Sequence, residues 1–314
     1  MHAAVLIDGR LEIQERPNPE PGPGDVVVSV AAAGVNAADL IQRRGLYPAP
    51  PGWPVDVPGL ELSGVVSEVG TGVDHRVLGR RVCAIVGGGG QATHCVVPAE
   101  HLITVPDTVE LTAAGGFAEA FVTAHDALTT QARTTASDRV LVSGAAGGVG
   151  SAAVQIAAHL GAHVIAVTRT PEFHPELRRL GAAETITLDE VATLEPVDVV
   201  IELVGAAHLQ AALSVLAPRA RVVVIGVGGG GRIELDLLTV MNRRATITGS
   251  TLRSRHRGEK SRVITRADAD LRADWSNGAI VVPVARVFQM TDIAGAYDYF
   301  AQSGKFGKVV VTTS

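Results

Sequence analysis

The residues whose types and spacing most suggest chemistry form a glycine-rich turn at 139–150, RVLVSGAAGGVG. An apolar run ending at Ser143 leads into a G-x-G-x-x-G pattern with alanine in its first slot, and apolar side chains at helical spacing follow over 151–160. Such a turn brings backbone close to a pyrophosphate, and helix amides bind the anion. A strand–helix turn without a ligand is the alternative. The expected binding residues are Ala145, Ala146, Gly147, Gly148, Val149 and Gly150.

The end of the next predicted strand indicates which dinucleotide binds. An NAD-binding protein usually carries Asp or Glu about 20 residues after the turn, where it bonds the ribose 2′-hydroxyl. This chain has Thr168, Arg169 and Thr170 there instead. A cation flanked by hydroxyls suits a 2′-phosphate, so NADPH is the expected cofactor. A solvated surface arginine is the alternative for Arg169.

Alternating strands and helices position this turn. Repeated βαβ units predict a doubly wound parallel sheet in an α/β domain. The expected helices are 112–132, 151–160, 176–180 and 206–216, and the expected strands are 139–143, 162–168, 197–203, 220–227 and 245–250.

The rest of the chain is predicted to be β-rich. Residues 3–105 hold short apolar segments separated by Pro- and Gly-rich turns, and a final strand at 308–312 is expected to close their sheet. We therefore expect a β-rich domain, 1–115 completed by 259–314, interrupted by an α/β domain at 116–258.

Composition excludes several classes of protein. The net charge of −5 argues against nucleic-acid binding, and no long uninterrupted apolar stretch or signal peptide is evident. The two cysteines, Cys83 and Cys95, cannot form a disulfide framework or a Cys-rich zinc site. A cytoplasmic protein that binds no membrane is expected.

Several motifs together resemble the medium-chain dehydrogenase/reductase superfamily. Segments 34–40, 42–48, 58–64 and 249–255, with the turn at 145–150, are similar to zinc-independent NADPH:quinone oxidoreductases, above all the branch that holds the p53-inducible quinone oxidoreductase. The resemblance implies a GroES-like domain joined to a Rossmann domain. It also implies no catalytic metal, because Asn36 and Leu60 stand where zinc-dependent relatives carry Cys and His.

The same resemblance implies further site residues. Asn36 and Tyr47 are expected near the nicotinamide, where either contacts the cofactor or substrate, and they are the candidate catalytic residues. Structural roles are the alternative throughout. The remaining expected cofactor contacts are Thr123, Gly226, Val227, Gly228, Leu252, Arg253, Gly307 and Lys308.

The chain also departs from the family pattern on the adenosine side. Residues 171–175 lack a lysine that often helps to hold the 2′-phosphate, and Leu188 replaces a common tyrosine. Arg169 is expected to take over the phosphate contact, with His174 as a weaker candidate.

The leading hypothesis is an NADPH-dependent reductase of a small-molecule quinone. Reduction of an activated C=C bond is the second, and a non-catalytic NADPH-binding sensor is the third. The resemblance also implies a homodimer joined through an edge strand at 245–252.

Overall fold

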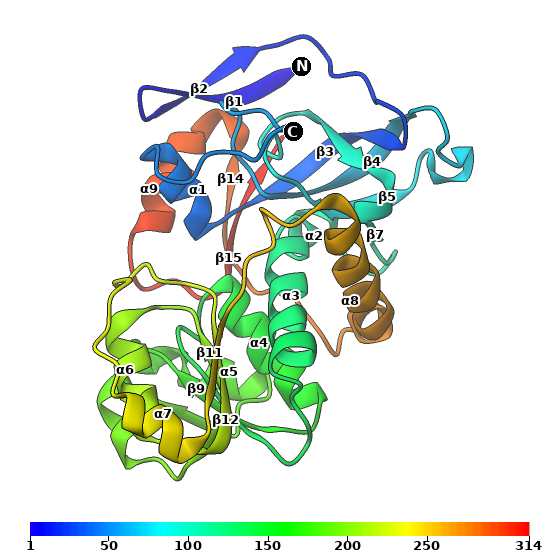
Figure 1. The fold of residues 1–314 in the computed structure, drawn as a ribbon. Coiled ribbons are helices and arrows are strands. Elements are labelled where there is room, and N and C mark those ends of the chain that lie inside the picture. The colour runs from blue at the N-terminus through cyan, green and yellow to red at the C-terminus, as the bar shows by residue number, and fades with distance from the viewer. Residues whose placement is uncertain (314) are drawn as a thin grey trace. The chain divides into compact units, whose positions relative to one another are not determined.

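The computed structural model describes residues 1–313, which form two compact units. Unit 1 contains Met1–Val122 and the chain from Leu252 onward, and unit 2 contains Thr123–Thr251 (Figure 1). Unit 1 is thus discontinuous in sequence, whereas unit 2 is a single segment.

Unit 1 is built on a seven-stranded sheet in the order β14-β15-β3-β4-β5-β7, with β6 also paired to β3. Strands β1 and β2 form a separate two-stranded antiparallel sheet in the same unit. Neighbours in the large sheet are antiparallel except β14 and β15. The strands are β1 (His2–Ile7), β2 (Arg10–Glu15), β3 (Asp25–Val35), β4 (Glu61–Val69), β5 (Arg81–Ile85), β6 (His94–Pro98), β7 (Leu102–Thr104), β14 (Val284–Gln289) and β15 (Lys308–Thr312). The expected β-rich organisation is confirmed.

Aliphatic side chains fill the core of this sheet. Val26, Val28 and Val30 alternate along β3 and pack against Leu62 and Val66 of β4. Such alternation is typical of strands that bury one face. With aromatic residues at only 4% of the chain, valine, leucine and alanine supply most of the buried surface.

The helices of unit 1 correct one sequence prediction. The helix expected over 112–132 is instead α2 (Leu111–Ala114), α3 (Ala118–His125) and a π-helical turn (Asp126–Gln131). A β-carbon on Gly115 would lie 2.8 Å from that of Ala32, so the chain passes too close to β3 for an ordinary helix there. The other helices of this unit are α1 (Ala37–Arg43), α8 (Arg257–Asn277) and α9 (Ile293–Ala301).

Helix α8 is the longest helix and was not predicted. Its buried side chains recur at helical spacing: Lys260, Ile264, Ala267, Leu271 and Trp275. The indole of Trp275 stacks on Phe117, with ring centroids 3.7 Å apart. Within residues 1–313, no helix has both the length and the apolar character needed to cross a bilayer.

Unit 2 has the expected doubly wound parallel sheet. Its six strands follow the order β10-β9-β8-β11-β12-β13, which is the 3-2-1-4-5-6 order of dinucleotide-binding domains. They are β8 (Arg139–Val142), β9 (His163–Val167), β10 (Glu184–Ile186), β11 (Val197–Glu202), β12 (Leu216–Val224) and β13 (Thr246–Gly249). The helices are α4 (Gly148–His159), α5 (His174–Arg179), α6 (Ala206–Ser214) and α7 (Leu237–Arg243) (Figure 1).

Candidate functional site

The glycine-rich turn lies at the carboxyl end of β8 and leads directly into α4. Gly144 has a φ of 58°, which favours glycine, and Gly147 caps the helix. A β-carbon on Gly150 would lie 2.3 Å from the carbonyl oxygen of Gly144. Only glycine at position 150 therefore lets α4 approach the turn so closely.

The turn is anchored to the neighbouring strand and leaves helix amides available. The N–H of Ala145 donates to the carbonyl of Val167 at the end of β9, at 3.0 Å. The first amides of a helix have no intrahelical acceptor, and the helix dipole is positive there. Residues 145–150 thus form a turn with the properties of a phosphate cradle.

The segment after β9 presents a cation at the same sheet edge. The hydroxyl of Thr168, itself buried, accepts a hydrogen bond from the N–H of Thr170 at 3.2 Å. Arg169 is exposed, and its side chain makes no hydrogen bond or ion pair with residues 1–313. This bend therefore holds Arg169 with its guanidinium available to a ligand.

A buried carboxylate that sequence reasoning missed joins two strand ends. Glu202, the last residue of β11, accepts from the hydroxyl of Ser143 at 2.8 Å and from the N–H groups of Val204 and Gly205 at 2.7 Å each. An acidic residue ending an otherwise apolar strand was the available signal. Glu202 fixes the loop after β11 beside the glycine-rich turn.

Charges at this sheet edge also act on His208, which lies on α6. Burial lowers the pKa of His208; the negative charge of Glu202 opposes this shift, and the positive charge of Arg169 adds to it. Glu202 and Arg169 are therefore close enough to His208 for their charges to affect it.

The other expected contacts of unit 2 are Gly226, Val227, Gly228 and Thr123. The glycines and Val227 form the loop after β12, where Val227 is 52% exposed and a β-carbon on Gly228 would meet open space. The hydroxyl of Thr123 is buried and has no hydrogen-bond partner among the described residues. An unsatisfied buried hydroxyl has capacity for a ligand.

In unit 1, Asn36 belongs to a polar group that we call the lysine cluster: Asn36, Glu61, Glu119 and Lys308. Glu61 and Lys308 are buried, and Asn36 and Glu119 are half-buried. The ammonium of Lys308 donates to Asn36 Oδ1 at 2.7 Å and to Glu61 Oε1 at 2.5 Å. Asn36 Nδ2 also donates to Glu61 Oε1, at 3.0 Å. Glu61 Oε2 accepts the backbone N–H of Glu119 at 2.9 Å. These bonds join β3, β4, α3 and β15.

Glycines make room for this cluster. A β-carbon on Gly34 would lie 2.3 Å from Glu61 Oε1, and one on Gly116 would lie 2.9 Å from Cγ of Lys308. Gly307, which precedes Lys308, has a φ of 90° and turns the chain into β15. The exposed fractions of the Lys308 and Glu61 side chains are 4% and 0%, so the ion pair is isolated from water.

Two carboxyl groups, Glu119 of the lysine cluster and Asp39 beside it, change protonation close to neutral pH. Burial raises the pKa of Asp39 to about 6, although the N–H groups of Asn36 and Gly59 bind it. Burial, followed by the negative charge of Glu61, raises the pKa of Glu119 to about 7. One oxygen of Glu119 is buried without a hydrogen-bond partner. Glu119 can thus hold or release a proton near neutrality, a property that sequence analysis missed.

Tyr47 and Arg253 form a second constellation in unit 1. The Arg253 guanidinium lies over the Tyr47 ring, 4.8 Å from its centroid, and donates to the Tyr47 carbonyl at 3.0 Å. It also donates to Gln42 Oε1 at 2.7 Å and to the carbonyl of Gly87. Leu252 and Arg253 are both buried. Arg253 therefore holds the Tyr47 loop in place, with its donors engaged by the protein.

The residues at the lysine cluster do not suit a zinc ion. Asn36 and Leu60 offer neither thiolate nor imidazole, and the ammonium of Lys308 already provides the cation between Asn36 and Glu61. Among residues 1–313, no group of three or more His, Cys, Asp or Glu side chains is arranged to hold a metal. Burial raises the pKa of the Cys95 thiol to about 12, which disfavours the thiolate form.

Two family models match the chain, one in each part. The alcohol dehydrogenase GroES-like domain matches residues 22–132. The zinc-binding dehydrogenase model matches residues 148–268. The expected pairing of a GroES-like domain with a Rossmann domain is confirmed.

Individual relatives match nearly the whole chain. Quinone oxidoreductase-like protein 2 of Bos taurus is 30% identical over 302 residues, covering 92% of this chain and 85% of the relative. The 2-haloacrylate reductase of Burkholderia sp is 30% identical over 304 residues, covering 93% and 91%. The quinone oxidoreductase of Thermus thermophilus, also solved in complex with NADPH, matches with a TM-score of 0.86 and 31% identity, covering 99% and 100%.

Proposed function

Because the chain belongs to the medium-chain dehydrogenase/reductase superfamily, we propose that it is a zinc-independent, NADPH-dependent quinone oxidoreductase. Within that family we assign it to the branch of the p53-inducible quinone oxidoreductase. The observation that carries the proposal is the strand–turn–helix at 139–150, followed at the next strand end by an exposed, unpaired Arg169. The bound cofactor supplies the reducing equivalents, and the protein binds, orients and shields the reactants.

The residues of unit 2 divide into two proposed roles. The amides at 148–150 bind the pyrophosphate, with Ala145, Ala146 and Gly147 shaping the turn around it, and Arg169, with Thr168 and Thr170, binds the 2′-phosphate. Gly226, Val227, Gly228 and Thr123 line the remainder of the cofactor. The closeness of Arg169 to this sheet edge and its lack of a protein partner support these assignments.

In unit 1 we assign Asn36 and Tyr47 to the nicotinamide and acceptor, with Leu252, Arg253, Gly307 and Lys308 supporting them. Asn36 is held rigidly by Glu61 and Lys308, and Tyr47 by Arg253. Reduction of a quinone needs no Lewis acid, because the acceptor is already electrophilic. The internal cation of the lysine cluster is consistent with that chemistry.

Reduction of an activated C=C bond is the second candidate function. One relative is a 2-haloacrylate reductase, and such a reaction must place a proton on carbon. Glu119, whose pKa burial raises to about 7, is a group that holds a proton at neutral pH. A protonated Glu119 favours reduction of a C=C bond over reduction of a quinone, because the oxygens of a reduced quinone can take their protons from water.

The test is to follow oxidation of NADPH or NADH by absorbance with an ortho-quinone, a para-quinone and an acrylate or enoyl thioester. Quinone-dependent loss of NADPH, much faster than that of NADH, is the expected result. Turnover with the unsaturated acid or thioester alone would select the second function. Cofactor binding without any turnover would instead identify a sensor.

We also propose a homodimer formed through unit 2. Strand β13 is an edge strand of its sheet, and the nearby helix α7 exposes Leu237, Leu238 and Met241 at 67%, 62% and 68%. An unprotected edge beside apolar side chains is suited to pairing with a second copy. Light scattering after size exclusion should give the dimer mass, and Leu238→Asp should shift the peak toward the monomer. A monomer mass for the parent chain would refute the proposal.

A further inference from the structure

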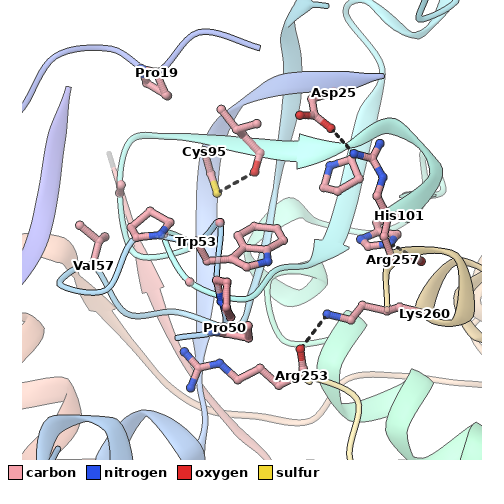
Figure 2. A pocket seen from close by; sticks show the side chains of 18 of the residues that line it. Pro19, Asp25, Pro50, Trp53, Val57, Cys95, His101, Arg253, Arg257 and Lys260 are labelled. Atoms are coloured by element: carbon pink, nitrogen blue, oxygen red, sulfur yellow. Dashed lines mark hydrogen bonds and ion pairs between the residues drawn. The ribbon is translucent and has the colours of Figure 1, made fainter. Parts of the chain in front are cut away.

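Unit 1 contains a cavity of about 760 Å³ (Figure 2). It shares Arg253 with the proposed cofactor contacts, but Lys260 and His101, which also line it, have no role in the proposed reaction. It is bounded by the loop at 50–57, by β6 and by the start of α8. Trp53, Pro50 and Pro54 give it a broad apolar wall. In Figure 2, Trp53 and Pro50 lie on one side of the cavity and His101 and Lys260 on the other.

Lys260 brings an ammonium group with unused donors to this cavity. Its side chain is 2% exposed and donates to the backbone carbonyl of Arg253 at 3.2 Å. An ammonium has three donors, and no carboxylate of residues 1–313 lies within ion-pair distance of it. Burial lowers the pKa of Lys260 and the negative charge of Glu119 opposes that shift, so an anion inside the cavity would stabilise the ammonium form further.

His101 brings an unused acceptor. It is 2% exposed, and its Nε2 contacts the carbonyl of Arg257 at 3.2 Å. Burial lowers the pKa of His101, so the ring is neutral near pH 7. A neutral ring that donates from Nε2 has its lone pair at Nδ1, and Nδ1 is buried without a partner.

His101 and Lys260 both line the cavity, and the guanidinium of Arg257 does not compete with them. The His101 ring contacts the backbone carbonyl of Arg257, which precedes Lys260 by one helical turn on α8. The positive charge of Lys260 also contributes to lowering the pKa of His101. Arg257 itself pairs with Glu100 at 2.8 Å and Asp25 at 2.9 Å.

We propose that this cavity is a binding site for a flat, apolar organic acid whose carboxylate lies beside a hydroxyl group. The carboxylate accepts from Lys260, the hydroxyl donates to Nδ1 of His101, and the apolar body packs against Trp53 and the prolines. The site lies wholly in unit 1 and needs neither NADPH nor a redox acceptor to bind its ligand.

Calorimetric titration of the full-length protein without cofactor tests the proposal, with 2-hydroxybenzoate, benzoate and 2-hydroxybenzyl alcohol as probes. We expect 2-hydroxybenzoate to bind about fivefold or more tightly than benzoate, and more tightly still than the neutral alcohol. His101→Phe should reduce 2-hydroxybenzoate to the affinity of benzoate. Lys260→Met should abolish the preference for the acid over the alcohol, whereas Lys305→Met, at another lysine of the chain, should preserve it.

The thermal unfolding transition of each variant shows whether it is folded. A further variant, Trp53→Ala, tests the apolar wall independently of the two polar groups. That change should weaken all three probes together by about tenfold. Equal affinity for the three probes, or binding that survives His101→Phe and Trp53→Ala unchanged, would overturn the assignment. Because no turnover is measured, failure of this site leaves the redox proposal standing, and the reverse also holds.

Discussion

The lysine cluster of unit 1 and the proposed nucleotide-binding sheet edge of unit 2 use polar groups in opposite ways. In the cluster, the ammonium of Lys308 donates hydrogen bonds to Asn36 and Glu61. Glu61 also accepts a hydrogen bond from the backbone N–H of Glu119, in α3. At the sheet edge, the amides that open α4 and the guanidinium of Arg169 find no acceptor among residues 1–313. In the first arrangement the charges of Lys308 and Glu61 pair with each other, and the second leaves its charge for a ligand.

The difference indicates what each region contributes. The buried ion pair of Lys308 and Glu61, which also bonds Asn36, fixes the strands that carry these residues, and its loss should appear as lost stability. Open groups at a strand–helix turn contribute little to folding, and their loss should appear as lost affinity. Substitutions in the two regions therefore separate the contributions.

The largest effect is expected from Lys308→Met. This change leaves the carboxylate of Glu61, which is 0% exposed, without its cation, and breaking such a pair costs about 3–5 kcal/mol. Both tryptophans, Trp53 and Trp275, lie in unit 1, so their fluorescence during denaturant unfolding reports the stability of that unit. Lys305→Met is the control. A loss below about 1 kcal/mol, as at an exposed pair, would show that the cluster does not stabilise unit 1.

An intermediate effect is expected from Arg169→Ala. Removing a charge-assisted bond to the 2′-phosphate should cost about 2 kcal/mol, or about thirtyfold in the dissociation constant for NADPH. Affinity for NADH and the stability of the protein should hardly change. The matched control is Arg178→Ala, an exposed arginine on α5. Equal losses of affinity for NADPH and NADH would mean that Arg169 does not contact the 2′-phosphate.

The effect expected from Glu119→Gln depends on pH and concerns stability alone. Because burial raises the pKa of Glu119 from 4.5 to about 7, the folded protein binds this proton more tightly than the unfolded chain does. The resulting stabilisation is complete below about pH 4.5 and is lost as the pH rises through about 7. Glu119→Gln should therefore gain thermal stability relative to the parent between pH 5 and pH 8.

The control for this pH effect is Glu172→Gln at an exposed glutamate, whose difference from the parent should stay constant with pH. A flat difference for Glu119→Gln as well would mean that Glu119 is ionised throughout.

Local patterns were sufficient to predict much of the fold. The alternating valines of β3 and the apolar run of β8 each gave a strand, and β8 leads into the glycine turn. Where two backbone segments approach closely, as at Gly150 and Gly144, only glycine fits, so the contact can be predicted from the residue type. The zinc-free character proposed here also rests on residue types, at Asn36 and Leu60.

Features that depend on distant contacts were not predictable in the same way. The break in the helix expected at 112–132 arises because Gly115 and Gly116 meet β3 and Lys308, which are far away in sequence. Helix α8 is predominantly polar, and only five of its residues are buried, so its apolar pattern is weak in the sequence. The unsatisfied atoms of Glu119 and His101 are defined by neighbours from several elements, so residue type alone could not reveal them.

The position of β15 has a consequence for the order in which this chain matures during synthesis. The strand Lys308–Thr312 lies between β14 and β3, and it supplies the counter-charge of Glu61. Unit 2 is one uninterrupted segment and can fold as it leaves the ribosome, since domains generally fold as units in order of synthesis. Unit 1 must wait for β15, which is synthesised after all of unit 2. Until then Glu61 has no ammonium partner, and the strand positions beside β3 and β14 stand open to other chains.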